Sequence, residues 1–461
     1  ATAARTGMPV ANATLTTLAD TAPELRQPWP RAALEELLSL LGAGPPAVDV
    51  IEAMDRTGLW GRLFPEWGAV RDLPPRDRAH VWTVDRHLVE AAAQAARLTT
   101  TVARPDLLLL GALLHDLGKG RDADHSVVGA ALAQQIGHRL GLPDPDVVTL
   151  RAMVRHHLLL PHTATRRDLD DPTTVQRVID TLDGDPVLLE LLVALAEADS
   201  LATGPGVWTE WRAALIFDLA ERCRAVLSGR PLPAPEPLSE EHRALAQQCA
   251  ANGLLYVESD AGAKPGAVTT ITVVAPGRPG LLALAAGVLA LHSLQVHAAD
   301  IRMLELPAGA AAAVSTFTVS PRFGRPPDVA LLRQDLARAL DGSLQLGDRL
   351  VAKERDYGEA SAHDPAAVRA GCPDAETRVL WFDDEATGAV ILELRTSDHR
   401  IGLLHRVAAA LESAAVTVRW ARVVTLGNSV VDSFSLPACG DAALPPVKSE
   451  QVERAVLSAA R

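Results

Sequence analysis

The spacing of apolar residues changes about halfway along the chain. From about residue 30 to residue 227, apolar residues recur three and four positions apart, which predicts helices. We expect helices within residues 32–41, 84–98, 107–114, 147–160 and 187–198. The following residues, 228–240, include four prolines, which cannot continue a helix and predict a stiff linker.

Beyond this linker the pattern predicts strands and helices in a repeated order. We expect strands at 269–274, 295–304 and 312–320 with helices at 281–291 and 328–340, and again strands at 390–395, 416–426 and 429–436 with helices at 403–413 and 450–460. In this internal repeat Gly280 aligns with Gly402. Each copy fits the ferredoxin-like order β-α-β-β-α-β. The predicted fold class is therefore α+β and multidomain, an all-α domain followed by two such units.

Charge and composition exclude several classes of protein. The 461 residues include 44 basic and 57 acidic side chains, a net charge of −13, and only 3% are aromatic, which argues against a nucleic-acid-binding surface. The longest apolar run, 281–291, is far shorter than the roughly 20 residues of a membrane helix, so we expect no membrane association. The cysteines occur singly, without a CxxC pair for zinc, and a reducing cytoplasm is the expected location.

Histidines are concentrated in the predicted helical half. Eight of the fourteen lie within residues 80–162. The dipeptide His115-Asp116 ends a strongly apolar helix, so its charge arrives where it must be paired or bound to metal. The same dipeptide at His363-Asp364 falls in a polar stretch, so the dipeptide alone indicates little.

Further candidate ligands stand at the edges of other apolar elements. They are His87, His125, His157 and Asp199, with His156 as a neighbour of the site. A single histidine of this kind is usually a satisfied core or surface residue, but an ordered series is more informative. Neutral imidazole and carboxylate groups suit Mn, Fe or Mg and require no thiolate.

The ordered series His87, His115-Asp116 and Asp199 resembles the HD-domain metal-dependent phosphohydrolases. The strings at 64–67, 83–87, 114–120, 124–126, 164–172 and 197–199 are similar to those of the PII uridylyltransferase/uridylyl-removing enzymes. The resemblance covers essentially the whole chain, because that family ends in two ACT domains, which match the repeat. It implies a helical linker region at 1–75, an HD phosphohydrolase domain at 76–228, a linker at 229–265, one ACT domain at 266–346, a linker at 347–387 and a second ACT domain at 388–461.

The resemblance also implies roles for individual residues. It implies His87, His115, Asp116 and Asp199 as ligands of a divalent metal, Mg or Mn with Fe as an alternative. It implies Asp116, Lys119, His125 and His157 as catalytic residues, and Lys119, Arg166 and Arg167 as phosphate-binding residues. The other interpretation of Lys119 and the two arginines, a solvated charged surface, stays open.

Each repeat carries a turn resembling the ACT signature, in which a glycine opens a helix whose N–H groups face an amino-acid carboxylate. The implied binding residues are Pro279, Gly280 and Leu281 in one copy and Ile401, Gly402 and Leu403 in the other. Both copies depart from the family, with Gly277 and His399 where Asp is usual and Ile401 where Pro is usual. A pair of units that only dimerises or packs therefore stays open.

The implied reaction is metal-dependent removal of a nucleotidyl group, UMP or AMP, from PII protein, with glutamine as the effector. Nothing before Pro30 matches the Gly-Ser turn and Asp-x-Asp pair of the family's nucleotidyltransferase domain, so we expect that domain to be absent from this chain. One alternative is a guanosine tetraphosphate hydrolase, which would carry a Glu-Asp pair where Lys119-Gly120 stands. Another is a non-catalytic amino-acid sensor, and homo-oligomerisation is left open.

Overall fold

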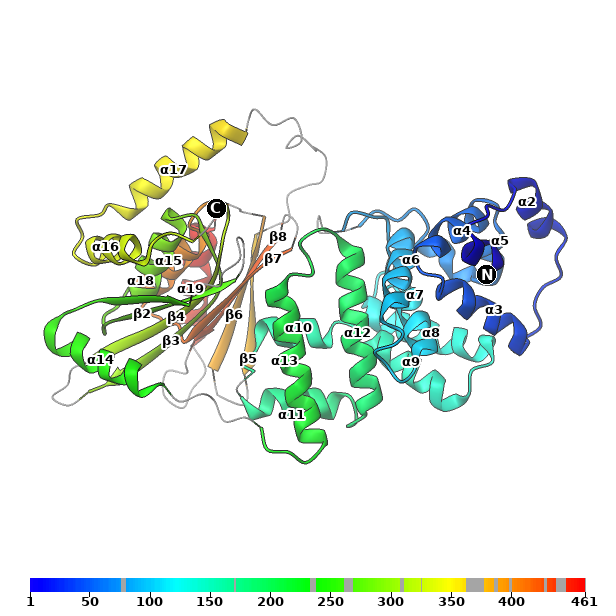
Figure 1. Cartoon of the computed structure of the whole chain (residues 1–461), viewed down its shortest axis with the longest axis horizontal. Helices are drawn as coiled ribbons and strands as arrows, with labels where there is room; N and C mark the ends of the chain where they lie inside the picture. The colour runs from blue at the N-terminus through cyan, green and yellow to red at the C-terminus, as the bar shows by residue number, and fades with distance from the viewer. Residues whose placement is uncertain are drawn as a thin grey trace. The chain divides into compact units, whose positions relative to one another are not determined.

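The computed structural model describes residues 1–75, 80–169, 171–232, 238–260, 268–306, 311–324, 326–361, 377–384, 389–397, 400–426, 429–436 and 445–460. The chain divides into a helical unit, Ala1–Pro233, and a mixed unit, Ala234–Arg461 (Figure 1). The predicted α+β fold class is confirmed. His363, Asp364 and His399, discussed from the sequence, lie outside the described residues, as do two of the four cysteines, Cys372 and Cys439.

The helical unit contains α1 (Thr2–Thr6), α2 (Asn12–Thr21), α3 (Arg31–Leu41), α4 (Pro45–Arg56), α5 (Leu59–Leu63), η1 (Pro65–Ala69), α6 (Val84–Ala95), η2 (Ala96–Leu98), α7 (Pro105–Leu114), α8 (His125–Leu140), α9 (Asp144–His156), α10 (Leu159–Arg166), α11 (Pro172–Thr181), α12 (Pro186–Thr203) and α13 (Glu210–Leu227). The expected helix at 147–160 is in fact two helices, α9 and α10. A continuous helix would press the ring of Pro161 against the carbonyl of His157, whereas α10 holds this proline in its first turn.

Helix α7 is the centre of the helical unit. Every residue from Leu107 to Leu114 is buried. The helix packs against α3, α6, α9 and α12, all of which contribute to one hydrophobic core. Because α7 is apolar on all sides, the residues that directly follow its last turn lie in the protein interior.

The mixed unit contains α14 (Glu240–Asn252), β1 (Tyr256–Asp260), β2 (Thr269–Pro276), α15 (Leu281–Leu291), β3 (Leu294–Glu305), β4 (Ala311–Pro321), α16 (Val329–Leu340), α17 (Leu346–Ser361), β5 (Arg378–Asp384), β6 (Ala389–Thr396), α18 (Leu403–Ser413), β7 (Trp420–Leu426), β8 (Ser429–Leu436) and α19 (Pro446–Ala459). Its strands form one antiparallel sheet in the order β1-β2-β4-β3-β7-β8-β6-β5. The two repeats meet where Ala298–Asp300 pairs with Trp420–Arg422.

The two faces of the sheet are covered by different helices. Alternating side chains such as Val273 and Val274 belong to separate hydrophobic clusters. Val273 lies in the large cluster that includes α15, α16 and α18, whereas Val274 lies in a small cluster with Ala246 and Cys249 of α14. Figure 1 shows α14 and α15 on opposite sides of the sheet.

The order of elements within each repeat differs from the expected β-α-β-β-α-β. In the described residues it is β-β-α-β-β-α, because β1 and β5 precede each copy and pair antiparallel with β2 and β6. A strand at the edge of a sheet pairs with only one neighbour. The edge strand of a repeat can therefore come from the beginning of the repeat, as β1 and β5 do, or from its end. The segments expected as linkers, 229–265 and 347–387, accordingly contain α14 and β1, and most of α17 with β5.

Within the described ranges, no single helix has both the length and the hydropathy of a membrane span. Helices α3 and α4 reach these values only when taken together, and they are bent by 120° relative to each other.

Candidate metal centre

The pair His115-Asp116 lies directly after the buried helix α7. Helix α7 ends at Leu114, and the exposed fractions of the two residues are 0% for His115 and 3% for Asp116. The Nδ1 of His115 donates to the carbonyl oxygen of Ala112 at 2.9 Å, since a carbonyl can only accept. This bond leaves Nε2 of His115 as the nitrogen that faces the rest of the site.

Three side chains from different elements converge around this nitrogen. The Nε2 atoms of His87 on α6 and His115 lie 3.2 Å apart, and Oδ1 of Asp199 on α12 lies 3.0 Å from His87 and 3.5 Å from His115. The ligand atoms of these three residues all lie within 4.8 Å of one another. Such a group could hold one divalent cation. We call His87, His115 and Asp199 the first triad.

A second group of three lies on the other side of the same carboxylate. The Oδ1 of Asp116 is 3.6 Å from Nε2 of His125, which begins α8, and 3.6 Å from Nε2 of His157, between α9 and α10. The Nδ1 of His157 donates to the carbonyl oxygen of Val154 at 2.8 Å, so its Nε2 faces the site. We call Asp116, His125 and His157 the second triad; it too could hold a metal ion.

Asp116 connects the two triads through its two oxygens. Its Oδ2 faces the first triad, 3.5 Å from His115 and 3.8 Å from His87, while its Oδ1 belongs to the second. Among the described residues, Oδ1 is buried and has no hydrogen-bond partner. A buried carboxylate oxygen in that state requires a cation nearby, and a bound metal would satisfy it.

The two carboxyl groups of the site are held ionised. Burial alone would raise the pKa of Asp116, but the charges of His115 and Lys119 outweigh burial and hold this pKa far below its usual range. Burial is also the largest single effect on Asp199, yet hydrogen bonds from His115 and His87 hold its pKa well below the ordinary value. The site therefore presents two negative charges to a cation.

The imidazoles respond mainly to burial. Burial lowers the pKa of His87 and His125, and lowers the pKa of His157 to about 4. His115 differs, because the neighbouring Asp116 and Asp199 outweigh its burial and raise its pKa. A neutral imidazole keeps a lone pair for a metal ion, so the lowered pKa values favour metal ligation at neutral pH.

Lys119 reaches the site from a turn and not from a helix. Helix α7 ends at Leu114, and residues 115–120 form turns. Nevertheless the Nζ of Lys119 lies 2.5 Å from Oδ2 of Asp116. This half-exposed ammonium group is thus placed at the mouth of the site.

Gly118 allows these turns to pack onto α8. A Cβ at this position would lie 2.0 Å from the carbonyl oxygen of His125 and 2.6 Å from the amide nitrogen of Gly129. Any larger residue would therefore separate the two segments. The glycine keeps His125 within reach of Asp116.

The arginines expected to bind phosphate stand at the end of α10. Arg166 is its last residue and Arg167 follows it, and both are half-buried. Helix α10 packs against α12 and α13. Their role in phosphate binding stays a prediction. His156 is not among the groups of possible metal ligands in the described residues.

Sequence reasoning did not single out two side chains that belong to this site. The ring of His80 lies 5.0 Å from that of His87, and His80 forms a possible ligand group with His87 and Asp116. Arg212 on α13 interacts electrostatically with Asp199, and its buried Nε and Nη1 have no hydrogen-bond partner among the described residues. His80 could have been found only by its place in the histidine-rich stretch, and Arg212 carries no local signal.

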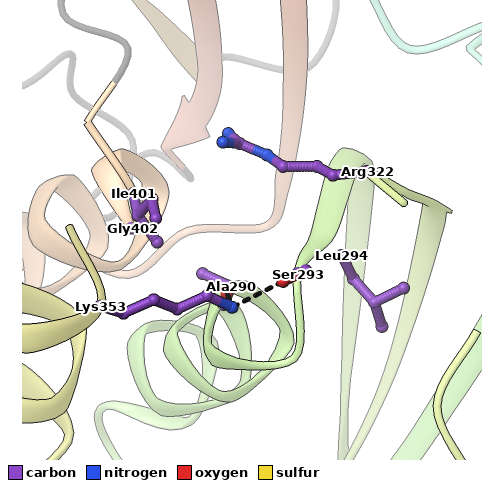
Figure 2. A pocket seen from close by; sticks show the side chains of 7 residues that line it. All are labelled: Ala290, Ser293, Leu294, Arg322, Lys353, Ile401 and Gly402. Carbon is purple, nitrogen blue, oxygen red and sulfur yellow. Dashed lines mark hydrogen bonds between the residues drawn. The ribbon is translucent and has the colours of Figure 1, made fainter. Parts of the chain in front are cut away.

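The two turns expected to bind an amino acid lie in the mixed unit. Gly402 lines two adjoining cavities, of which the smaller is also lined by Ile401 and the larger, of about 300 Å³, by Leu403. Figure 2 shows Arg322, Lys353 and Gly402 around the smaller cavity. Pro279, Gly280 and Leu281 form the equivalent turn of the first repeat, where Gly280 has the same left-handed backbone as Gly402.

We expect metal binding to depend on the pair His115 and Asp116. Replacing both with Ala should abolish tightly held Mn or Mg, because one change removes a ligand of the first triad and the other removes the carboxylate that joins both triads. Metal content per chain after dialysis is the measurement. The exposed pair His138 and Asp144, 3.8 Å apart, provides the matched double-alanine control. Equal metal content in the two double variants would contradict the assignment.

We also expect Gly118→Ala to damage the site without touching a ligand. The new Cβ must push the turn away from α8, at a cost of about 1–3 kcal/mol in the free energy of unfolding, and should weaken metal binding because the same turn carries Asp116. Thermal unfolding and metal titration measure both effects. Gly61→Ala is the control, since a Cβ there meets nothing within 4 Å. The prediction fails if the two variants match in stability and metal affinity.

Comparisons with known proteins agree with this geometry. Residues 84–203 match the HD domain family. The chain is 50% identical over 448 residues to the bifunctional uridylyltransferase/uridylyl-removing enzyme of Mycobacterium tuberculosis, covering 96% of this chain and 54% of that protein. It is 39% identical over 491 residues to the enzyme of the same name from Streptomyces coelicolor, covering 98% of this chain and 58% of that protein.

A third relative, from Corynebacterium glutamicum and bearing the same name, is 42% identical over 209 residues, which cover 45% of this chain and 30% of that protein. The chain thus spans about half the length of the first two relatives. The chain carries an HD domain and, over 96% of its length, is homologous to part of a bifunctional uridylyltransferase/uridylyl-removing enzyme.

Proposed function

We propose that the helical unit is a metal-dependent phosphodiesterase that removes a uridylyl group from PII protein. The observation that carries this proposal is the Asp116 carboxylate, whose Oδ2 lies 3.5 Å from His115 of the first triad and whose Oδ1 lies 3.6 Å from His157 of the second. The relatives are named for uridylyl removal, which favours UMP over AMP as the product. PII as the substrate follows from the resemblance to the family.

The residues of the site fit hydrolysis of a phosphodiester. A divalent metal, when bound, lowers the pKa of a water molecule and polarises a phosphoryl oxygen. His87, His115, Asp116 and Asp199 would hold it, and Nε2 of His125 would stay unligated, so that it keeps a lone pair. Lys119 is placed to neutralise a phosphate oxygen, because its ammonium group lies at the edge of the site and is partly exposed.

Proton transfer falls to His125 in this proposal. Its side chain is about one-third exposed, unlike those of His87, His115 and His157, so it can contact both solvent and substrate. Burial lowers its pKa, so the ring is neutral at neutral pH and can accept a proton from the attacking water. A neutral base next to the carboxylate that joins the two triads suits a hydrolase better than a phosphate-transfer enzyme, which must exclude water.

Control by glutamine is assigned to the mixed unit. The cavities at the Gly402 turn are lined by cationic side chains, Arg322 and Arg400 in the larger and Arg322 and Lys353 in the smaller. Helix α18 begins at this turn without a side-chain cap, so its first N–H groups favour an anion. The buried carboxylate of Asp432 also lines the larger cavity and would suit the ammonium group of an amino acid.

The direct test is incubation of the chain with uridylylated PII and Mn or Mg. We expect release of UMP and free PII, and no release by the His115→Ala/Asp116→Ala variant. Guanosine tetraphosphate is offered in a parallel reaction. Hydrolysis of that nucleotide alone would establish the alternative hydrolase, and metal binding without hydrolysis of either substrate would establish the non-catalytic sensor.

Arg212 is expected to contribute to binding of the phosphodiester. Its buried nitrogens lie near the first triad, and the loss of a charge-assisted hydrogen bond costs about 1.5–3 kcal/mol, or roughly 10- to 100-fold in kcat/KM. Arg212→Gln should show this loss while keeping its metal content, and Arg212→Lys should recover part of the activity. Arg151→Gln, an exposed change on α9, is the control. Unchanged kcat/KM in Arg212→Gln would remove this residue from the site.

A further inference from the structure

The two turns of the mixed unit can be compared residue by residue. Helices α15 and α18 both have 11 residues, and each follows a glycine in the left-handed conformation, Gly280 with φ 81° and Gly402 with φ 82°. The shift along the sequence that takes Gly280 to Gly402 also takes Ala290 to Glu412, the second-last residues of their helices. The helices pack against each other, and the Nδ1 of His405 donates to the carbonyl oxygen of Ala283 at 2.7 Å.

At the Gly402 turn, the end of the neighbouring helix leaves space. Ala290 lines both cavities there, and its methyl group carries no charge. The carbonyl groups at the end of α15 accept hydrogen bonds from a side chain outside the first repeat. The Nζ of Lys353 on α17 donates to the carbonyl oxygens of Ala290 and Leu291 at 3.1 and 2.5 Å. Figure 2 shows this lysine beside Ala290 and Ser293, with Gly402 across the cavity.

At the Gly280 turn, the corresponding position is filled by a carboxylate. A Cβ built on Gly280 would lie 2.8 Å from Oε2 and 2.9 Å from Oε1 of Glu412. The carboxylate of Glu412 therefore rests directly against the turn. Helix α15 begins with no side-chain cap, so the positive end of its dipole attracts this negative charge.

The arginines of the two turns also differ in what they do. The Nη1 of Arg278, before Gly280, donates to the carbonyl oxygen of Leu340 at 2.8 Å and so binds the end of α16. Arg400, its counterpart before Gly402, lines the larger cavity. The three described atoms nearest to a Cβ on Gly402 all belong to the apolar side chain of Leu350, with Cδ1 at 3.0 Å, so no carboxylate rests against this turn as Glu412 rests against the other.

We propose that the two turns are unequal: the Gly402 turn binds the carboxylate of an external amino acid, and the Gly280 turn is occupied by the chain's own Glu412. This inference rests on the proposed control by glutamine and specifies it. It predicts one glutamine per chain, and it assigns the difference between the sites to a single pair of residues, Ala290 and Glu412.

Exchanging these two residue types tests the inference. Isothermal titration of the full chain with L-glutamine should give one equivalent for the unmodified chain, none for Ala290→Glu and two for Glu412→Ala. Two equivalents for the unmodified chain, or unchanged binding in Ala290→Glu, would overturn the inference and leave the proposed control by glutamine intact. Release of UMP in the absence of glutamine, measured in the same samples, tests the proposed hydrolase activity independently of glutamine binding.

A second measurement does not depend on glutamine. Removing the carboxylate in Glu412→Ala should lower Tm by about 2–4 °C. Sodium acetate should then raise the Tm of this variant more than that of the unmodified chain, relative to equal sodium chloride, because acetate can take the vacated place. If glutamine binds nowhere, this acetate effect still supports an occupied Gly280 turn, and equal shifts in the two proteins refute it. Glu412→Gln keeps the shape without the charge and should show the lower Tm without recovery in acetate.

Discussion

The helical unit depends on one constraint, a carboxylate that must stay ionised inside an apolar core. Asp116 follows helix α7, of which residues 107–114 are all buried, at the helix end where the dipole is itself negative. Its charge can be kept there only if cations surround it. Helices α6, α8 and α12 and the break between α9 and α10 each bring a ligand or counter-charge to this point, so the arrangement of the helices and the site have the same cause.

Small backbone features shape this site. Gly118 lets the turn after His115 touch the backbone of α8, and Pro161 stands in the first turn of α10, just after the break that holds His157. Neither residue could act as a ligand. A metal centre built from five elements thus relies on close backbone approach as much as on its donor atoms, because ligand atoms must lie within a few ångströms of one another.

The sequence singled out the residues of this cluster because each stands in or near the first or last turn of a helix. The structure brings His87, His115, Asp116, Asp199, His125 and His157 together, although their roles as ligands stay predictions. Arg212 was missed because its approach to Asp199 depends on how α13 packs, which no local pattern encodes. Strand β1 was missed because it is mostly polar and half-exposed, so it lacks the alternation of a strand with one buried face. Pro161 indicates the break of the helix at His157. The break was not predicted because the apolar spacing continues on both sides of it.

In the mixed unit the charge that needs a partner is positive, because it is the start of a helix. The uncapped start of a helix is positive, and a nearby carboxylate stabilises it, whether that carboxylate belongs to the chain or to a ligand. In a repeated fold both turns inherit this property, so a ligand would be expected at both. One side chain on the adjacent helix is enough to separate them, because Glu412 reaches its turn and Ala290 cannot. The duplicated unit can therefore keep one turn for stability and leave the other to respond to a small molecule.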